Sequence, residues 1–190
     1  MGNKQPISLF TPGEWIPINE NKVKVGLGLD YLPGNVFDLD GSVTAFNECN
    51  EVVESVYYHR LKGLNGAIRH YGDNLTGEGS GDDEVISIHL NEIPSNVYSL
   101  AVTVNSFKEQ SIIKAKSAYI RLFKGKIVKK EIGRYILNQM KDCIGMLLGL
   151  FERDRKTRGW FFRVMADPIE GNVVSKSYNR LKQLLNGYSE

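Results

Sequence analysis

The chain has 190 residues, of which 42% are hydrophobic and 24% are charged, and its formal net charge is +2. These values fit one soluble globular domain, or one domain with an appendage, and exclude a strongly basic or acidic protein. The two cysteines, Cys49 and Cys143, lie far apart and outside any zinc-ligand spacing, which indicates two buried free thiols rather than a disulfide framework.

No apolar run is long enough to span a bilayer, and residues 1–6 lack the apolar core of a secretory signal. We therefore expect a cytoplasmic protein without a transmembrane segment. The small net charge likewise gives no reason to expect a nucleic-acid partner.

Most of the chain is predicted to form short β-strands. Residues 1–22 are broken by prolines and read as an arm that could add an edge strand. Beyond them, apolar runs separated by turn residues indicate strands, many with a period of two. The predicted strands cover residues 23–27, 43–46, 52–58, 68–71, 85–90, 100–104, 117–123, 126–135, 144–151 and 159–164. About nine or ten short strands at turn-marked intervals predict an all-β fold, a two-sheet β-sandwich.

The C-terminal residues follow a different pattern. Val174, Tyr178, Leu181 and Leu185 are spaced so that they share one face of a helix, which predicts a short amphipathic helix over residues 175–186. The simpler expectation is that this face packs back on the sandwich. The alternative is that it docks a protein partner or an anionic surface.

We therefore divide the chain into a sandwich domain, residues 1–167, and a C-terminal extension with the helix, residues 168–190.

An acidic segment, residues 73–84, concentrates negative charge in one place. It holds five carboxylates, one Asn amide and three glycines, and it contains no Lys, Arg or His. Like charges at this density repel one another, so the segment either stays solvated or folds around a cation. Hard oxygen ligands on a flexible, glycine-containing loop are those that Ca²⁺ prefers.

Three other kinds of acidic or glycine-rich site fit less well. An EF-hand loop would need ligands or Gly where Leu75, Gly77 and Glu78 stand, and its flanks would be helical. A phosphate-binding loop would be opposed by the carboxylates, and it would be followed by a helix rather than a strand. A glycosidase-like carboxylate pair is weakly indicated, because no aromatic platform is evident near the segment.

A second acidic element strengthens the Ca²⁺ interpretation. Asp38 and Asp40 are two residues apart, so that on an extended segment both side chains point the same way. One loop rarely supplies the six to eight oxygens that Ca²⁺ takes, whereas two loops at one end of a sandwich can. Asp30 is a third possibility, although an Asp there can also cap a turn.

Three stretches in this order resemble the TerD (tellurium-resistance) domain family. They are VGLGLD at residues 25–30, FDLDGS at 37–42 and GDNLTGEGSGDDE at 72–84, against VGLGWD, FDLDAS and GDNLTGEGDGDDE in the family. The resemblance runs from about Ser8 to Val164 and leaves the C-terminal helix unexplained.

The resemblance implies a two-sheet β-sandwich that binds one or two Ca²⁺ ions through the two acidic loops. The metal-ligand candidates carried over from the family are Asp38, Asp40, Asp73, Asn74, Asp82, Asp83 and Glu84, with backbone carbonyls near Gly77 and Glu78. Ser80 stands where the family has Asp, which removes one carboxylate and weakens or abolishes one of two possible ion sites.

The family is associated with tellurite and general chemical-stress resistance in bacteria, and some eukaryotic relatives are described as cyclic-AMP-binding. We therefore expect a non-catalytic Ca²⁺-binding protein in stress response or signalling. The alternative is a protein that binds a cyclic nucleotide (cAMP) or another anion through a metal-bridged phosphate. An enzyme is disfavoured because His59, His70 and His89 are scattered and no nucleophile–base pair is evident; His70, just before the acidic segment, is the least unlikely to act.

Overall fold

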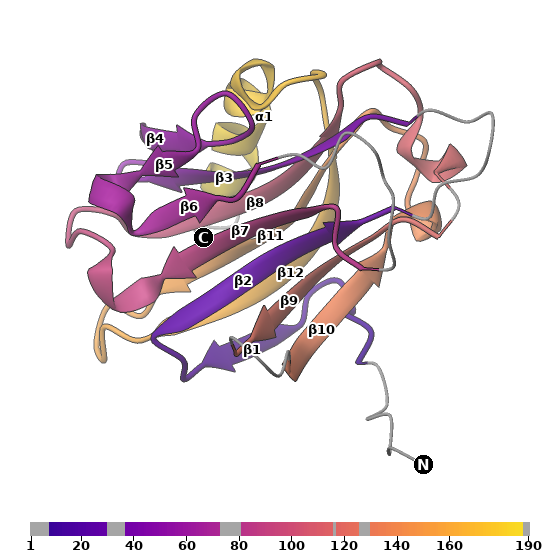
Figure 1. Ribbon diagram of the computed structural model, residues 1–190. Coiled ribbons are helices and arrows are strands. Elements are labelled where there is room, and N and C mark those ends of the chain that lie inside the picture. Colours follow the sequence, from indigo (N-terminus) through magenta and orange to yellow (C-terminus); the bar gives the residue numbers. More distant parts are fainter. Residues whose placement is uncertain (1–7, 30–36, 73–80, 116, 126–129, 188–190) are drawn as a thin grey trace, which may run out of the picture.

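A computed structural model describes residues 8–29, 37–72, 81–115, 117–125 and 130–187 (Figure 1). Within these ranges the chain forms twelve strands, four short 3₁₀ helices and one α-helix. The strands are β1 (Trp15–Ile18), β2 (Lys22–Gly28), β3 (Leu39–Phe46), β4 (Val52–Val56), β5 (Lys62–Gly63), β6 (Ile68–His70), β7 (Glu84–His89), β8 (Ser99–Ser106), β9 (Tyr119–Lys124), β10 (Lys130–Ile136), β11 (Gly145–Arg153) and β12 (Trp160–Ile169). The 3₁₀ helices are η1 (Leu64–Gly66), η2 (Leu90–Glu92), η3 (Ile112–Lys114) and η4 (Leu137–Gln139), and the α-helix is α1 (Val174–Gly187).

The strands form two packed antiparallel sheets, which confirms the predicted β-sandwich. The first sheet has the order β1-β12-β11-β8-β3-β4, and the second sheet has the order β10-β9-β2-β7-β6-β5. The proline-broken arm adds edge strand β1 to β12, as expected, and β9 pairs with β10 as the predicted hairpin. The two-residue strand β5 was not predicted, because it is too short to show a period of two.

The main core lies between the two sheets. It is built from alternate residues of the strands, such as Val23 and Ile88 of the second sheet and Val43 and Val102 of the first sheet, and these four side chains have no exposed surface. This arrangement follows from the strand period, because every second side chain points to the same face.

The C-terminal helix packs on the outer face of the first sheet. Leu181 and Leu185 are buried in a second apolar cluster with Phe46 and Leu150. The Tyr178 hydroxyl also lies 2.7 Å from the Ser55 hydroxyl. The expected helix and its packing on the sandwich are therefore confirmed. Since its apolar face is covered within the chain, the alternative expectation of a protein partner docking on that face is not supported.

The expectation of two buried thiols was wrong for Cys49. Both cysteines are free, but Cys49 is exposed and Cys143 is half-buried. Cys49 lies in the turn between β3 and β4, where its backbone N–H donates to the Asn47 side chain at 2.9 Å. Turns of this kind lie on the surface, so the small apolar side chain there has nothing to pack against. No helix in the described ranges is long and apolar enough to cross a membrane.

Candidate metal site

The structure describes five of the nine predicted metal ligands. Asp38, Asp40, Asp82, Asp83 and Glu84 are described, at the starts of β3 and β7. The other four, Asp73, Asn74, Gly77 and Glu78, lie outside the described residues, as do Asp30 and Ser80. Among the residues that are described, no group of three or more His, Cys, Asp or Glu side chains is arranged to hold a metal ion.

The two acidic elements meet where the first sheet faces the second. The backbone N–H of Gly41 in β3 donates to Oε2 of Glu84 in β7 at 2.6 Å, and Glu84 and Asp40 are both buried. A Cβ atom at Gly41 would lie 3.0 Å from the same carboxylate oxygen. The absence of a side chain at Gly41 gives the Glu84 carboxylate room to approach the strand.

His70 lies beside Glu84 at this junction. Its Nε2 is 3.5 Å from Glu84 Oε2, and its Nδ1 accepts a hydrogen bond from the Gly72 backbone N–H at 3.1 Å. Because Nδ1 accepts, a neutral imidazole carries its proton on Nε2, facing the carboxylate. Both side chains are buried, so this histidine packs beside Glu84 within the sandwich. Its sequence position just before the acidic segment was the only signal that it lies here.

Asp83 fastens the end of the acidic segment to the end of β2. Its Oδ2 accepts the Leu29 backbone N–H at 2.6 Å, and its own N–H donates to the Leu27 carbonyl at 2.7 Å. The motif at residues 25–30 therefore contributes backbone groups that hold the carboxylate in place.

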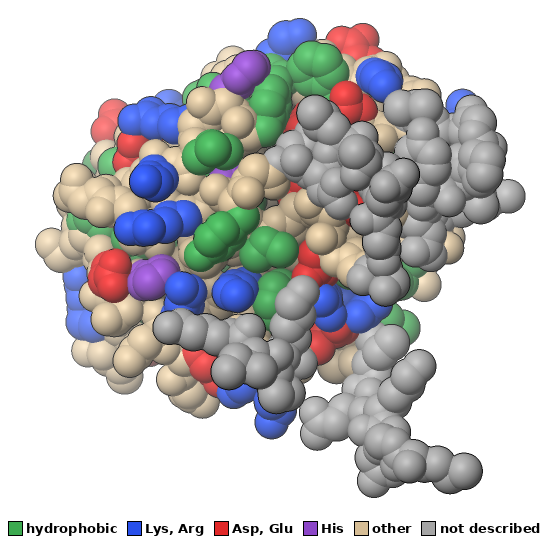
Figure 2. All heavy atoms as spheres, viewed as in Figure 1, with side chains coloured by type: hydrophobic (Ala, Val, Ile, Leu, Met, Phe, Trp, Pro, Cys, Tyr) green, Lys and Arg blue, Asp and Glu red, His purple; other side chains and the backbone are tan. Residues whose placement is uncertain are grey.

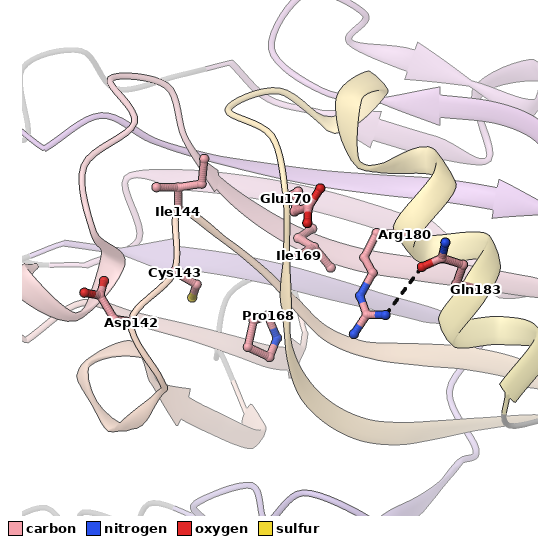
Figure 3. Close-up of a pocket in the computed structure, with 8 residues that line it drawn as sticks. All are labelled: Asp142, Cys143, Ile144, Pro168, Ile169, Glu170, Arg180 and Gln183. Carbon is pink, nitrogen blue, oxygen red and sulfur yellow. Dashed lines mark hydrogen bonds between the residues drawn. The ribbon is translucent and has the colours of Figure 1, made fainter.

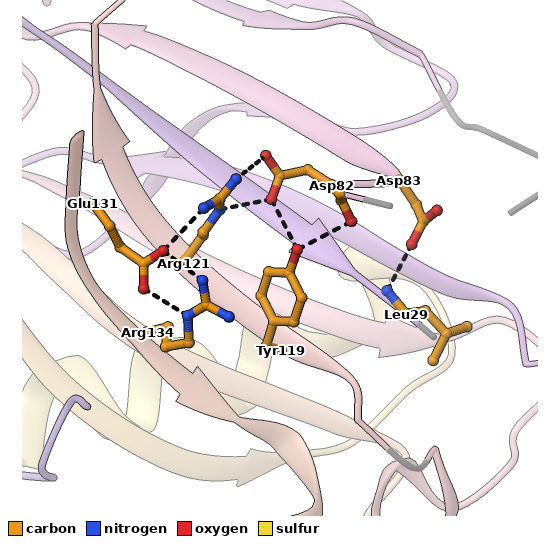
Figure 4. A network of polar contacts seen from close by, with 8 residues as sticks. Leu29, Asp82, Asp83, Tyr119, Arg121, Glu131 and Arg134 are labelled. Atoms are coloured by element: carbon orange, nitrogen blue, oxygen red, sulfur yellow. Dashed lines mark hydrogen bonds and ion pairs between the residues drawn. The ribbon is translucent and has the colours of Figure 1, made fainter. Parts of the chain in front are cut away.

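Asp82 belongs to a different network, on the other face of the second sheet (Figure 4). Its two carboxylate oxygens accept from Nε and Nη2 of Arg121 at 2.7 and 2.8 Å. Arg121 also donates to Glu131 at 2.9 Å, and Arg134 donates to Glu131 through two nitrogens. The Tyr119 hydroxyl donates to the Gly81 carbonyl at 3.0 Å. These partners come from β9 and β10, and no sequence spacing connects them to the acidic segment.

The network raises the pKa of Arg121. Burial lowers the pKa of Arg121, but hydrogen bonds to Asp82 and Glu131 outweigh it and raise that pKa above its ordinary value. Arg121 is therefore a permanent cation beside Asp82.

Two glycines of β2 make space for this network. A Cβ atom at Gly26 would lie 2.6 Å from Cγ of Asp82, and one at Gly28 would lie 2.3 Å from Cζ of Tyr119. Glycines two residues apart present the same face of the strand, so both side chains can lie across it.

An aromatic group borders the other acidic element. The Tyr58 ring lies 4.3 Å from the His59 ring and 6.0 Å from the Phe107 ring, measured between centroids. The Phe107 N–H donates to the Asp38 carbonyl at 2.9 Å. Burial first, and then the negative charges of Asp40 and Asp38, raise the pKa of Tyr58. These aromatic residues come from two separate loops, so their proximity could not be seen in the sequence.

The outer face of the second sheet carries positive charge (Figure 2). The Lys24, Ser87 and Arg69 positions are register partners across β2, β7 and β6. A hydrogen bond with Ser87, followed by the charges of Lys22, Lys24 and Arg69, lowers the pKa of exposed Tyr71. Cations therefore gather beside the residue that stands just before the acidic segment.

A cavity of about 610 Å³ lies elsewhere, between β11, β12 and α1 (Figure 3). Apolar Ile144 and Ile169 line it together with the charged side chains of Asp142, Glu170 and Arg180. None of the predicted metal ligands that the structure describes lines this cavity, so it is separate from the described parts of the acidic elements.

The described donors suit a hard cation. Asp38, Asp40, Asp83 and Glu84 offer carboxylate oxygens from two chain segments that meet at the Gly41–Glu84 contact, which is the ligand type that Ca²⁺ requires. Asp40 and Glu84 are both buried, so these two carboxylates lie inside the sandwich rather than on its surface. The residue types of these donors therefore fit a Ca²⁺ site, while their described positions by themselves form no metal-binding group.

Comparison with known proteins agrees with the family that the sequence motifs resemble. The model of a family described as the TerD domain matches residues 10–176. The chain is 36% identical over 183 residues to General stress protein 16U of Bacillus subtilis (strain 168), covering 91% of both chains. It is 30% identical over 165 residues to the Tellurium resistance protein TerZ of Serratia marcescens, covering 87% of this chain and 82% of that protein.

A solved structure supports the fold. The crystal structure of a homologue of telluride resistance protein (TerD) from Streptomyces coelicolor A3(2) aligns with a TM-score of 0.73 at 16% identity, covering 85% of this chain and 97% of that one. At this identity the likeness shows the fold alone.

Proposed function

This chain belongs to the TerD domain family, and we propose that it is a non-catalytic Ca²⁺-binding protein that acts in the response to chemical stress. The stress role is supported by the similarity to a general stress protein and to a tellurium resistance protein. The fold alone would not support a stress-response role, because proteins with the same fold can have many different functions.

The Ca²⁺ part of the proposal rests above all on the contact between Gly41 and Glu84. This contact brings the start of β3, with Asp38 and Asp40, against the start of β7, with Asp83 and Glu84. These four carboxylates would hold the ion, together with the sequence-predicted ligands of residues 73–78. The ion would supply positive charge that offsets the carboxylates. It would also link the two sheets, because its ligands come from both of them.

The proposal of a non-catalytic protein is supported by the positions of the histidines. His59 packs against Tyr58, and His89 lies 3.1 Å from Glu92 on the surface. His70 is buried behind Glu84. Among the described residues, the contacts of these rings are with an aromatic ring, carboxylates and a backbone N–H, and these contacts include no nucleophile to activate.

Calorimetric titration of Ca²⁺ into metal-stripped protein tests this function. We expect saturable heat in the wild type, and at least tenfold weaker binding in Asp40→Asn and Glu84→Gln, since affinity follows ligand charge and ~1.4 kcal/mol corresponds to tenfold. Glu48→Gln is the matched control, because this exposed acid lies in the turn beyond the far end of β3. No heat and no change in thermal midpoint at millimolar Ca²⁺ would refute the proposal.

A second candidate is a protein that binds an anionic ligand such as a cyclic nucleotide. It is supported by the cations Lys22, Lys24 and Arg69, which lie beside Tyr71 at the start of the acidic segment. Titration of cyclic AMP with and without Ca²⁺ tests it. Binding that requires Ca²⁺ and weakens in Arg69→Gln supports a metal-bridged phosphate, and the absence of binding in both conditions removes this candidate.

A further inference from the structure

The three consecutive acids that end the acidic segment point to three different places. Glu84 points into the sandwich, where it accepts the Gly41 N–H. Asp83 accepts the Leu29 N–H at the end of β2. Asp82 lies across the outer face of the second sheet and pairs with Arg121. These three consecutive carboxylates therefore have different partners, and Asp82 is the one that pairs with Arg121.

The surroundings of Asp82 are built for an arginine partner. Its side chain has no exposed surface, and the side chain of Arg121 is 13% exposed. The two parallel N–H···O bonds of 2.7 and 2.8 Å form the two-pronged pairing that arginine makes with a carboxylate. Gly26 opens the space that the Asp82 carboxylate occupies.

Arg121 is itself held firmly. Its guanidinium lies 4.8 Å from the centre of the Phe123 ring, and its third nitrogen donates to Glu131. Glu131 is in turn held by Arg134. The anchor for Asp82 is therefore a largely buried side chain on the paired strands β9 and β10.

We infer that Asp82 is a positioning residue, which fastens the end of the acidic segment to β9 through Arg121 and leaves metal ligation to Asp83, Glu84 and the other carboxylates. This inference rests on the proposed Ca²⁺ function. It gives Asp82 a different role from the other acids of the same motif, which are proposed metal ligands. Partners outside the ligand shell that orient metal ligands are known to influence affinity strongly.

A double-mutant cycle in the full-length protein tests the inference. Ca²⁺ affinity is measured by calorimetry for wild type, Asp82→Asn, Arg121→Gln and the double variant. If Asp82 acts as an anchor, Asp82→Asn should weaken Ca²⁺ binding about tenfold when Arg121 is present, as is typical for a residue outside the ligand shell. In the Arg121→Gln background the same change alters Kd less than about twofold, because the anchor is already lost.

The same cycle can overturn the inference. If Asp82 ligates the ion, Asp82→Asn weakens binding by a similar factor in both backgrounds, and the anchoring role is refuted. If Arg121→Gln does not fold, Arg121→Lys replaces it in the cycle, because lysine keeps the charge but loses the two parallel hydrogen bonds.

A second readout separates this inference from the proposed function. The thermal midpoint of all four metal-stripped proteins is measured in a chelator. If the wild type gives no heat with Ca²⁺, the proposed function fails, and the midpoints still decide whether Asp82 and Arg121 act as a pair. Additive losses of stability would overturn the pairing, and a double variant no less stable than the worse single variant supports it.

Discussion

Gly28 illustrates how one residue of the β2 motif acts through a neighbour distant in sequence. A Cβ atom there would lie 2.3 Å from Cζ of Tyr119, far inside contact distance. We expect Gly28→Ala to lower the free energy of unfolding by about 1–3 kcal/mol, as overpacking does. Urea denaturation measures this change. In a Tyr119→Ala background the same substitution should cost less, and an equal cost in both backgrounds would show that the clash with Tyr119 is not the cause.

Glu131 gives a prediction on pH at the same scale. Burial raises its pKa, but hydrogen bonds from Arg134 and Arg121 outweigh burial and leave the pKa below its ordinary value. A lowered carboxyl pKa adds stability that is present above the unfolded-state value of about 4.3 and is lost as the pH falls through the folded-state pKa. We therefore expect Glu131→Gln to have a lower thermal midpoint than the wild type at pH 7. The gap should narrow below pH ~4, and a constant gap from pH 7 to pH 3 would contradict the prediction.

At the scale of the element, α1 acts as a cover for the first sheet. Leu181 has no exposed surface and packs in the cluster that includes Phe46 and Leu150. We expect Leu181→Ala to lower the free energy of unfolding by about 2–5 kcal/mol, the range for a buried leucine. Gln183→Ala is the control, since this exposed helix position should change stability by less than about 0.5 kcal/mol. Denaturation curves of equal midpoint for the two variants would mean that the helix is not part of the cooperative unit.

At the scale of the whole molecule, the proposed ion joins the two sheets. Ligands from β3 in one sheet and β7 in the other mean that binding favours the folded sandwich over the unfolded chain. A ligand that binds only the folded state at one hundred times its Kd stabilises that state by about 2.7 kcal/mol. We expect the urea midpoint of the wild type to rise with Ca²⁺ concentration and to fall again with a chelator. Asp40→Asn should need a much higher Ca²⁺ concentration for the same rise, and a midpoint independent of Ca²⁺ in both proteins would contradict the coupling.

The local structure and the type of candidate ligands could be predicted from the sequence. The period of two in stretches such as residues 23–27 predicted strands, and the helical spacing from Val174 to Leu185 predicted α1 and its buried face. These signals are local, because alternation and helical spacing describe which side a residue faces. The motifs at residues 25–30, 37–42 and 72–84 likewise indicated the family, which the comparisons confirm.

Which side chains contact one another depends on the tertiary structure and could not be predicted. Strand order brought Glu84 to Gly41, and it placed Arg121 opposite Asp82, although these residues are far apart in the chain. The acids at positions 82–84 look equivalent in sequence, yet they face an arginine, a backbone N–H at the end of β2, and the interior. The physical reason is that a carboxylate's role depends on which donor or cation lies within about 3 Å of it, and in a β-sandwich those partners come from strands that pair over long sequence distances.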